Sequence, residues 1–177
     1  MENYPYIIKL KVLLLFGLLT IPSVLLGQEV LFNKTFDNVD RLNFVRAKTP
    51  TLDNGYLILG SNSTIEYDTL WMIKLDAFSC VEWERFHTPF EDLNIDQIAT
   101  TSVRQNSDST FLAIVTFQNP LDDDNLDLGM IKYNKHGEEL WTETYGWEEK
   151  DDIGLDMQIL PDGGAVFVGR VSEWVST

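Results

Sequence analysis

The chain has 177 residues, of which 44% are hydrophobic and 23% are charged, and this composition indicates one globular domain rather than a disordered chain. Its net charge of −15 argues against a nucleic-acid partner, because phosphate binding requires clustered lysine and arginine. The single cysteine, Cys80, excludes an internal disulfide and cannot by itself build a zinc or thiol-redox site.

Residues 1–27 have the features of a signal peptide. Lys9 and Lys11 form a basic start, and the apolar stretch Val12–Gly27 follows and ends in a small residue. This stretch is shorter than the roughly 20 residues that a membrane-spanning helix needs, although an uncleaved anchor is the alternative. We therefore expect residues 28–177 to form the mature protein, secreted or on the cell surface, with no membrane span after cleavage.

Three short segments are continuously apolar and rich in β-branched or aromatic residues: Tyr56–Leu59, Phe111–Phe117 and Ala165–Val168. They are too short for ordinary helices, and their composition predicts strands that are covered on both faces. Asp53-Asn54-Gly55 precedes the first and Asp162-Gly163-Gly164 the third, and such residues favour tight turns.

Two further pairs of segments predict hairpins. Leu70–Leu75 leads through a short turn to Val81–Phe86, and Leu128–Tyr133 leads in the same way to Glu139–Tyr145. The second strand of each hairpin carries a tryptophan.

A fourth element in each unit has a weaker signal. Ile95–Val103 and Ile153–Leu160 alternate only in part between apolar and polar residues. We predict a strand at each.

The predicted hairpins are two copies of one sequence pattern, 58 residues apart. The matched pairs are Asp76 with Asn134, Ser79 with Gly137, and Trp83 with Trp141. A second set of landmarks recurs at a shift of 109 residues: Asp53 with Asp162, Leu57 with Val166, and Gly60 with Gly169. A repeat of a little over fifty residues is typical of a stacked or circular array of one supersecondary unit.

The predicted fold is therefore all-β and β-propeller-like, with four-stranded antiparallel blades. Residues 28–177 form a partial propeller of about two and a half blades, whereas a closed ring needs roughly four or more. We expect completion by further blades or by self-association. Trp83 and Trp141 are expected to bridge adjacent blades, and a β-sandwich in which both are core tryptophans is the alternative.

The segments "WMIKLD", "VEWERF", "MIKYNKHGEELWTETYGWEEKDDIG" and "LPDGGAVFVG" resemble the propeller repeats of secreted and surface proteins from Bacteroidetes-type bacteria. The resemblance implies export, and complete members often carry more blades and a C-terminal sorting domain for type IX secretion. Ser79 and Asp108-Ser109-Thr110 depart from the glycine-bearing turns of that pattern. The tryptophan spacing is also similar to the docking repeats of quinone-dependent dehydrogenase propellers, but no matching set of cofactor residues is present.

Residues with catalytic or metal-binding chemistry are sparse. His87 and His136 are the only histidines, and their spacing suggests neither a metal pair nor an acid–base dyad. The acidic cluster Asp122–Asp127 could offer oxygen ligands to Ca²⁺, but it lacks the glycine and terminal glutamate of an EF-hand loop, and a solvated loop is favoured. We predict no catalytic, cofactor-binding or metal-binding residues.

These observations favour a non-catalytic secreted or cell-surface module that binds a protein or a glycan. The alternative is the N-terminal part of a secreted carbohydrate-active or other propeller enzyme whose catalytic residues lie beyond residue 177. A purely structural spacer in a surface adhesin is a third possibility.

Overall fold

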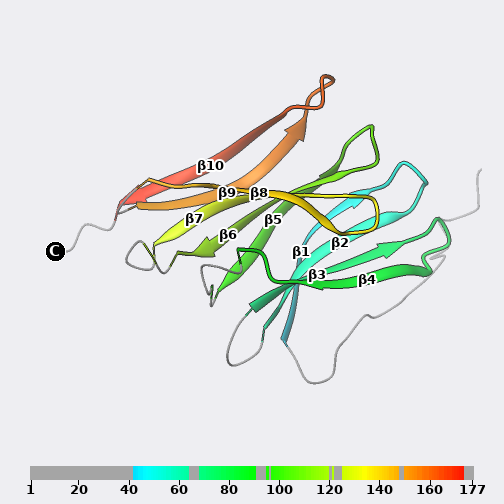
Figure 1. Cartoon of the computed structure of the whole chain (residues 1–177), viewed down its shortest axis with the longest axis horizontal. Coiled ribbons are helices and arrows are strands. Elements are labelled where there is room, and N and C mark those ends of the chain that lie inside the picture. Colours follow the sequence, from blue (N-terminus) through cyan, green and yellow to red (C-terminus); the bar gives the residue numbers. More distant parts are fainter. Residues whose placement is uncertain are drawn as a thin grey trace, which may run out of the picture. The chain divides into compact units, whose positions relative to one another are not determined.

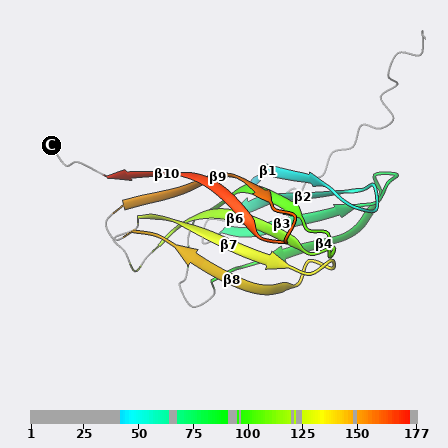
Figure 2. The same ribbon diagram turned by 90° about the horizontal axis from the view of Figure 1, so that it is seen from above.

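Ten strands, consecutive in the chain, form three antiparallel sheets in the computed structural model (Figures 1 and 2). The structure describes residues 42–63, 68–90, 95, 97–119, 121, 125–147 and 150–173, all within one compact unit, Phe36–Thr177. The predicted signal peptide lies outside the described residues and stays a prediction.

The first sheet has the strand order β1-β2-β3-β4 and the second the order β5-β6-β7-β8, while the third consists of β9 and β10. The strands of the first sheet are β1 (Leu42–Pro50), β2 (Tyr56–Ser63), β3 (Asp68–Leu75) and β4 (Val81–His87). Those of the second are β5 (Ile98–Gln105), β6 (Phe111–Gln118), β7 (Leu126–Tyr133) and β8 (Glu139–Tyr145). The third sheet contains β9 (Lys150–Ile159) and β10 (Ala165–Glu173).

The all-β prediction and the antiparallel pairing are confirmed, with sheets of four, four and two strands. No sheet closes on itself within the described part of the chain. Strand β1 was not predicted, and β5 begins at Ile98, three residues later than the sequence suggested. Both are the first strands of their sheets, where partial alternation gives the weakest sequence signal.

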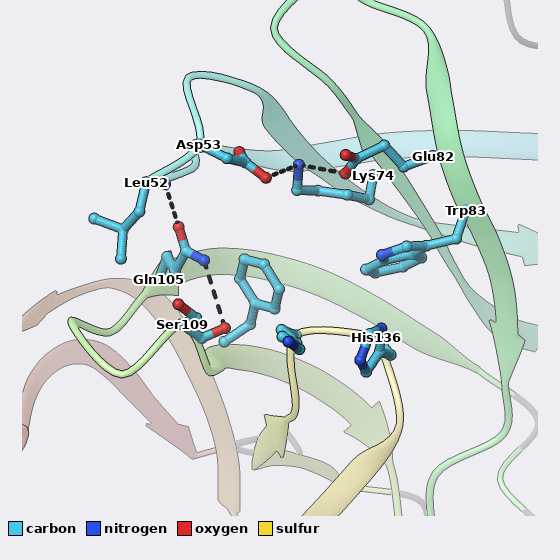
Figure 3. Close-up of a pocket in the computed structure, with 10 residues that line it drawn as sticks. Leu52, Asp53, Lys74, Glu82, Trp83, Gln105, Ser109 and His136 are labelled. Atoms are coloured by element: carbon cyan, nitrogen blue, oxygen red, sulfur yellow. Dashed lines mark hydrogen bonds and ion pairs between the residues drawn. The ribbon is translucent and has the colours of Figure 1, made fainter.

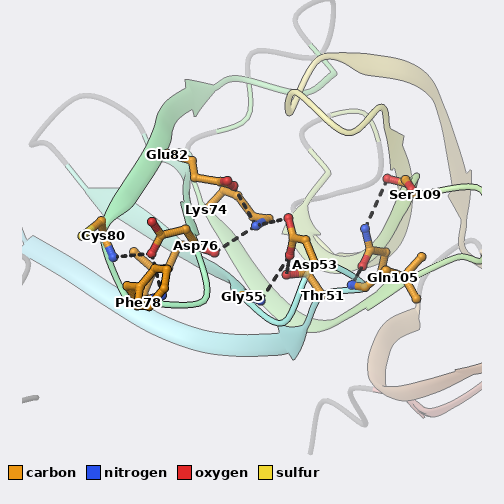
Figure 4. A network of polar contacts seen from close by, with 12 residues as sticks. Thr51, Asp53, Gly55, Lys74, Asp76, Phe78, Cys80, Glu82, Gln105 and Ser109 are labelled. Carbon is orange, nitrogen blue, oxygen red and sulfur yellow. Dashed lines mark hydrogen bonds and ion pairs between the residues drawn. The ribbon is translucent and has the colours of Figure 1, made fainter. Parts of the chain in front are cut away.

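The turns that lead into β2, β6 and β10 share one geometry, shown for the first of them in Figure 4. The carboxylates of Asp53, Asp108 and Asp162 each accept a hydrogen bond from the backbone N–H two residues later, at 2.9–3.1 Å. The residue after the aspartate has a positive φ in all three turns: 65° at Asn54, 68° at Ser109 and 85° at Gly163. The Asp108-Ser109-Thr110 departure in sequence therefore leaves the turn unchanged.

The hairpin turns between β3 and β4 and between β7 and β8 are also alike. Asp76 accepts hydrogen bonds from the N–H groups of Phe78 and Cys80, both at 2.8 Å (Figure 4). Asn134 does the same for His136 and Glu138. Ser79 has φ 63° and Gly137 has φ 78°, so a serine takes the left-handed conformation at the position where the second copy has glycine.

The core lies between successive sheets. Leu57 and Leu59 of β2 belong to the same buried cluster as Phe111 and Phe117 of β6, which joins the first and second sheets. A smaller cluster joins the second sheet to β9 through Met157. The first sheet is thus covered by the second, and the second by the third.

Trp83 extends from β4 of the first sheet to the second sheet. It packs against the cluster between the two sheets, and its ring lies over Gly137 in the β7–β8 turn. Trp83 therefore bridges the first two sheets, as the repeat predicted. Trp141 has the equivalent strand position, since it pairs with Lys132 as Trp83 pairs with Lys74, and it is 38% exposed.

We expect Gly137→Ala to destabilise the protein by about 2–3 kcal/mol, of which left-handed strain supplies about 1 kcal/mol. A Cβ atom at Gly137 would lie 2.8 Å from the Trp83 ring. Gly163 is the control, because it also has a positive φ but no atom within 4 Å of an added Cβ. Gly163→Ala should therefore cost only about 1 kcal/mol in denaturant unfolding. Equal losses in the two variants would show that the tryptophan contact does not require glycine.

Candidate functional site

A cavity of about 500 Å³ opens where the turn ends of the first and second sheets meet (Figure 3). Its lining combines charged groups, amides, a histidine and aromatic rings. The residues are Leu52, Asp53, Lys74, Glu82, Trp83, Gln105, Ser109, Phe111, Lys135 and His136.

Lys74 is the central charged group of this cavity. Its side chain is only 4% exposed, because β3 lies inside the first sheet. The ammonium donates to Asp53 Oδ2 at 2.8 Å, to Glu82 Oε2 at 2.7 Å and to the Leu75 carbonyl at 2.9 Å. A buried ammonium has three donors, and all three are satisfied here.

Asp53 and Lys74 stabilise each other's charged forms. The hydrogen bond from Lys74, together with one from Thr51, lowers the pKa of Asp53 from 3.8 to about 2. Burial alone would lower the pKa of Lys74, but the hydrogen bonds to Asp53 and Glu82 outweigh it and raise the pKa above 10.5. Asp53 is therefore held as a carboxylate and not as a neutral acid poised for proton transfer.

The carboxylates remain open to a ligand. The side chains of Asp53 and Glu82 are 54% and 42% exposed, so each keeps oxygen lone pairs that water can reach. Figure 3 shows Trp83 and His136 on the side of the cavity opposite Asp53. Asp53 thus faces an aromatic wall, while Glu82 lies beside Trp83 on β4 (Figure 3).

Gln105 fixes the far side of the cavity, which belongs to the second sheet. Its Oε1 accepts from the backbone N–H of Leu52 at 2.7 Å, and its Nε2 donates to the Ser109 carbonyl at 3.4 Å (Figure 3). One side chain therefore ties the β1–β2 turn to the β5–β6 turn, and this holds the two walls of the cavity at a fixed separation.

The second sheet contains a weaker copy of the ion pair. Lys132 and Asp108 are repeat-equivalent to Lys74 and Asp53, but they are 3.9 Å apart and Lys132 is 25% exposed. Leu140 of β8 stands where Glu82 stands in β4. The pairing of aspartate with lysine is hence a feature of the repeat, while the third partner, Glu82, belongs to the first sheet.

His87 lies in a different place from the cavity, at the end of β4. Its Nδ1 is 3.0 Å from the Tyr133 hydroxyl and its Nε2 is 2.8 Å from Glu139 Oε2. Tyr133 is fully buried, and burial, followed by the charge of Glu139, raises the pKa of its phenol well above the ordinary value. A substrate cannot reach this hydroxyl, so the Glu–His–Tyr chain links two sheets and does not form a catalytic triad.

The other residues singled out in the sequence are dispersed. His136 lines the cavity, and Cys80 is an exposed free thiol in the β3–β4 turn. Asp127 is 6% exposed and accepts a hydrogen bond from Asn119 Nδ2 at 2.7 Å. The rest of the predicted acidic cluster, Asp122–Asp124, lies outside the described residues, so calcium binding there stays a hypothesis. Among the described residues, no group of histidine, cysteine or acidic side chains has the arrangement of a metal site.

Sequence reasoning missed the cavity. Its central residues are Asp53, Lys74 and Glu82, which fall within the repeated segments but in no motif that marks a binding or catalytic site. One signal was available, because Lys74 interrupts a strand that is otherwise apolar on both faces. A buried lysine needs carboxylate partners, and Asp53 and Glu82 supply them at 2.8 and 2.7 Å.

No protein-family model matches the chain, and no curated protein matches it either. In the part of the chain that the structure describes, no helix has the length and apolar character needed to cross a membrane.

Proposed function

We propose that this protein is a non-catalytic, secreted or cell-surface binding module of the β-propeller repeat type, and that the cavity between its first two sheets binds a glycan. The repeated turns, the repeated hairpins and the packing of successive sheets support the repeat architecture. The signal peptide predicted for residues 1–27 supports a location outside the cell.

The observation that carries the proposal is the lining of the cavity. Sugar rings present apolar C–H faces that pack on aromatic rings, and hydroxyls that donate to carboxylates. Trp83 supplies the aromatic surface, while Asp53 and Glu82 supply half-exposed carboxylate acceptors. The concave shape and the few fixed polar groups suit a small ligand. The carboxylate of Asp53 is held in its charged form by Lys74, and this favours binding over acid-catalysed hydrolysis.

A glycan array probed with the full chain tests this proposal. We expect binding to a restricted set of neutral or basic glycans, because the protein's net charge of −15 disfavours anionic sugars. His136→Ala should weaken binding to those glycans by about tenfold, the loss expected when one polar contact covered by the bound glycan is removed.

Phe78→Ala provides the matched control. Phe78 has the same turn position in the first sheet as His136 has in the second, is 87% exposed and does not line the cavity. It should bind like the unchanged protein. A blank array, or equal losses in the two variants, would contradict the assignment of glycan binding to this cavity.

A further inference from the structure

Strand β10 has an open edge that its two repeat-equivalent strands do not have. β2 pairs with β1 and β3, and β6 pairs with β5 and β7. Within the described residues β10 pairs only with β9 (Figure 1). An open edge presents unpaired backbone N–H and carbonyl groups, which can pair with another strand.

A groove of about 320 Å³ runs beside this edge. Apolar side chains from the end of β8 and from β10 line it: Tyr145, Trp147, Phe167 and Val171. Trp147 is 67% exposed and Val171 is 55% exposed, which is unusual for large apolar residues gathered at one place.

The equivalent place between the first and second sheets is filled by a strand. There, Tyr133 of β7 packs edge-on against His87 at the end of β4, with ring centroids 5.5 Å apart. Tyr145 at the end of β8 is the repeat-equivalent of His87. A strand added beside β10 would thus place a side chain against Tyr145 as β7 places Tyr133 against His87.

The ion pairs of the turn aspartates also indicate that a strand can be added beside β10. The turn aspartates Asp53 and Asp108 each pair with a lysine of the strand that follows β2 or β6, namely Lys74 or Lys132. Asp162 is the third turn aspartate, is exposed, and has no ion pair among the described residues. A strand beside β10 with a lysine at the equivalent position would complete this pair.

We propose that the open edge of β10 and the groove beside it, called here the β10 surface, bind a β-hairpin of the same repeat type. Both β3 and β7 contain the triplet Met-Ile-Lys, and both place it in the same register against the preceding strand. If a strand with this triplet paired with β10 in the same register, its methionine would lie opposite Val168, its isoleucine opposite Phe167 and its lysine opposite Val166. The partner is thus an extended polypeptide hairpin held by backbone pairing, and the site is separate from the glycan cavity.

The test uses a fluorescein-labelled synthetic peptide of residues 126–145, the β7–β8 hairpin, titrated with the full chain. We expect saturable binding in fluorescence anisotropy and slower hydrogen exchange in β10 when the peptide is bound. A peptide with Lys132→Glu should bind about tenfold more weakly, because a carboxylate would face Asp162.

Two variants of the protein test whether the peptide binds at the β10 surface. Val166→Lys places a second lysine opposite the peptide lysine and should weaken binding by about tenfold. Leu155→Lys is the control, since Leu155 lies in β9 and is 56% exposed against 53% for Val166. Absence of binding, or equal losses in both variants, would overturn the proposal. Protection of β10 in a dimer without peptide would also overturn it, because a second copy would then be the occupant.

Discussion

Replacing Gly55 by alanine is expected to lower the free energy of unfolding by about 3 kcal/mol or more. A Cβ atom on Gly55 would overlap the carbonyl oxygen of Leu75 and would come within 2.9 Å of Lys74 Nζ. The carbonyl belongs to the backbone of β3 and cannot move aside without displacing that strand. Chemical denaturation followed by tryptophan fluorescence measures the loss.

Gly164→Ala is the matched control for this prediction. Gly164 has the same place in the turn before β10, and the nearest atom to an added Cβ is Asp162 Oδ1 at 3.1 Å. That oxygen belongs to an exposed side chain that can rotate, so the cost should stay below about 1 kcal/mol. Thr110 occupies the third equivalent position and shows that the turn itself accepts a side chain. Similar losses at Gly55 and Gly164 would mean that the close approach to β3 is not the reason for glycine.

The second large effect is expected when Lys74 loses the charge of both its partners. Asp53→Asn combined with Glu82→Gln keeps the shape of the site but leaves a buried ammonium without a counter-charge, and should cost about 2–3 kcal/mol. Lys74→Met should change stability by less than about 1 kcal/mol, since methionine fits the apolar strand and the exposed carboxylates remain hydrated. Equal losses of stability in the double variant and in Lys74→Met would contradict this prediction.

The same ion group predicts a dependence of stability on pH. Asp53 has a pKa of about 2 in the folded protein and 3.8 as its ordinary value. Its contribution is therefore present above pH ~4 and is lost as the pH falls through about 2. Lys74→Met removes the main cause of the lowered pKa. As the pH falls through that window in urea unfolding, the unchanged protein should lose stability relative to this variant, and a constant difference between the two would contradict the prediction.

Much of the sheet structure was predictable because the same strand pattern recurs in each copy of the repeat. The strands Tyr56–Ser63, Phe111–Gln118 and Ala165–Glu173 contain the three apolar segments almost unchanged. The first strands of the sheets were less visible. In β1, Lys48 is exposed and Thr49 is buried, as expected for neighbouring residues of a strand. The strand has too few apolar residues, however, for this alternation to be visible in the sequence.

The candidate site was hidden because it depends on contacts between distant segments. Gln105 and Leu52 are 53 residues apart, and nothing local to either predicts their hydrogen bond. Trp83 could be assigned to a bridging role from the repeat, but its partner, Gly137, could be identified only from the structure. Periodicity therefore predicted the strands, whereas the cavity depended on how two turns meet across a sheet boundary.

The consecutive order of strands within every sheet has a consequence for how the chain folds. Each strand finds its hydrogen-bonding partner in the segment just before or just after it, so pairing closes only short loops. Loop closure of this kind carries a small entropic cost and allows fast formation for an all-β protein. Folding can therefore advance from one end of the chain to the other, with each finished sheet acting as the template on which the next one condenses.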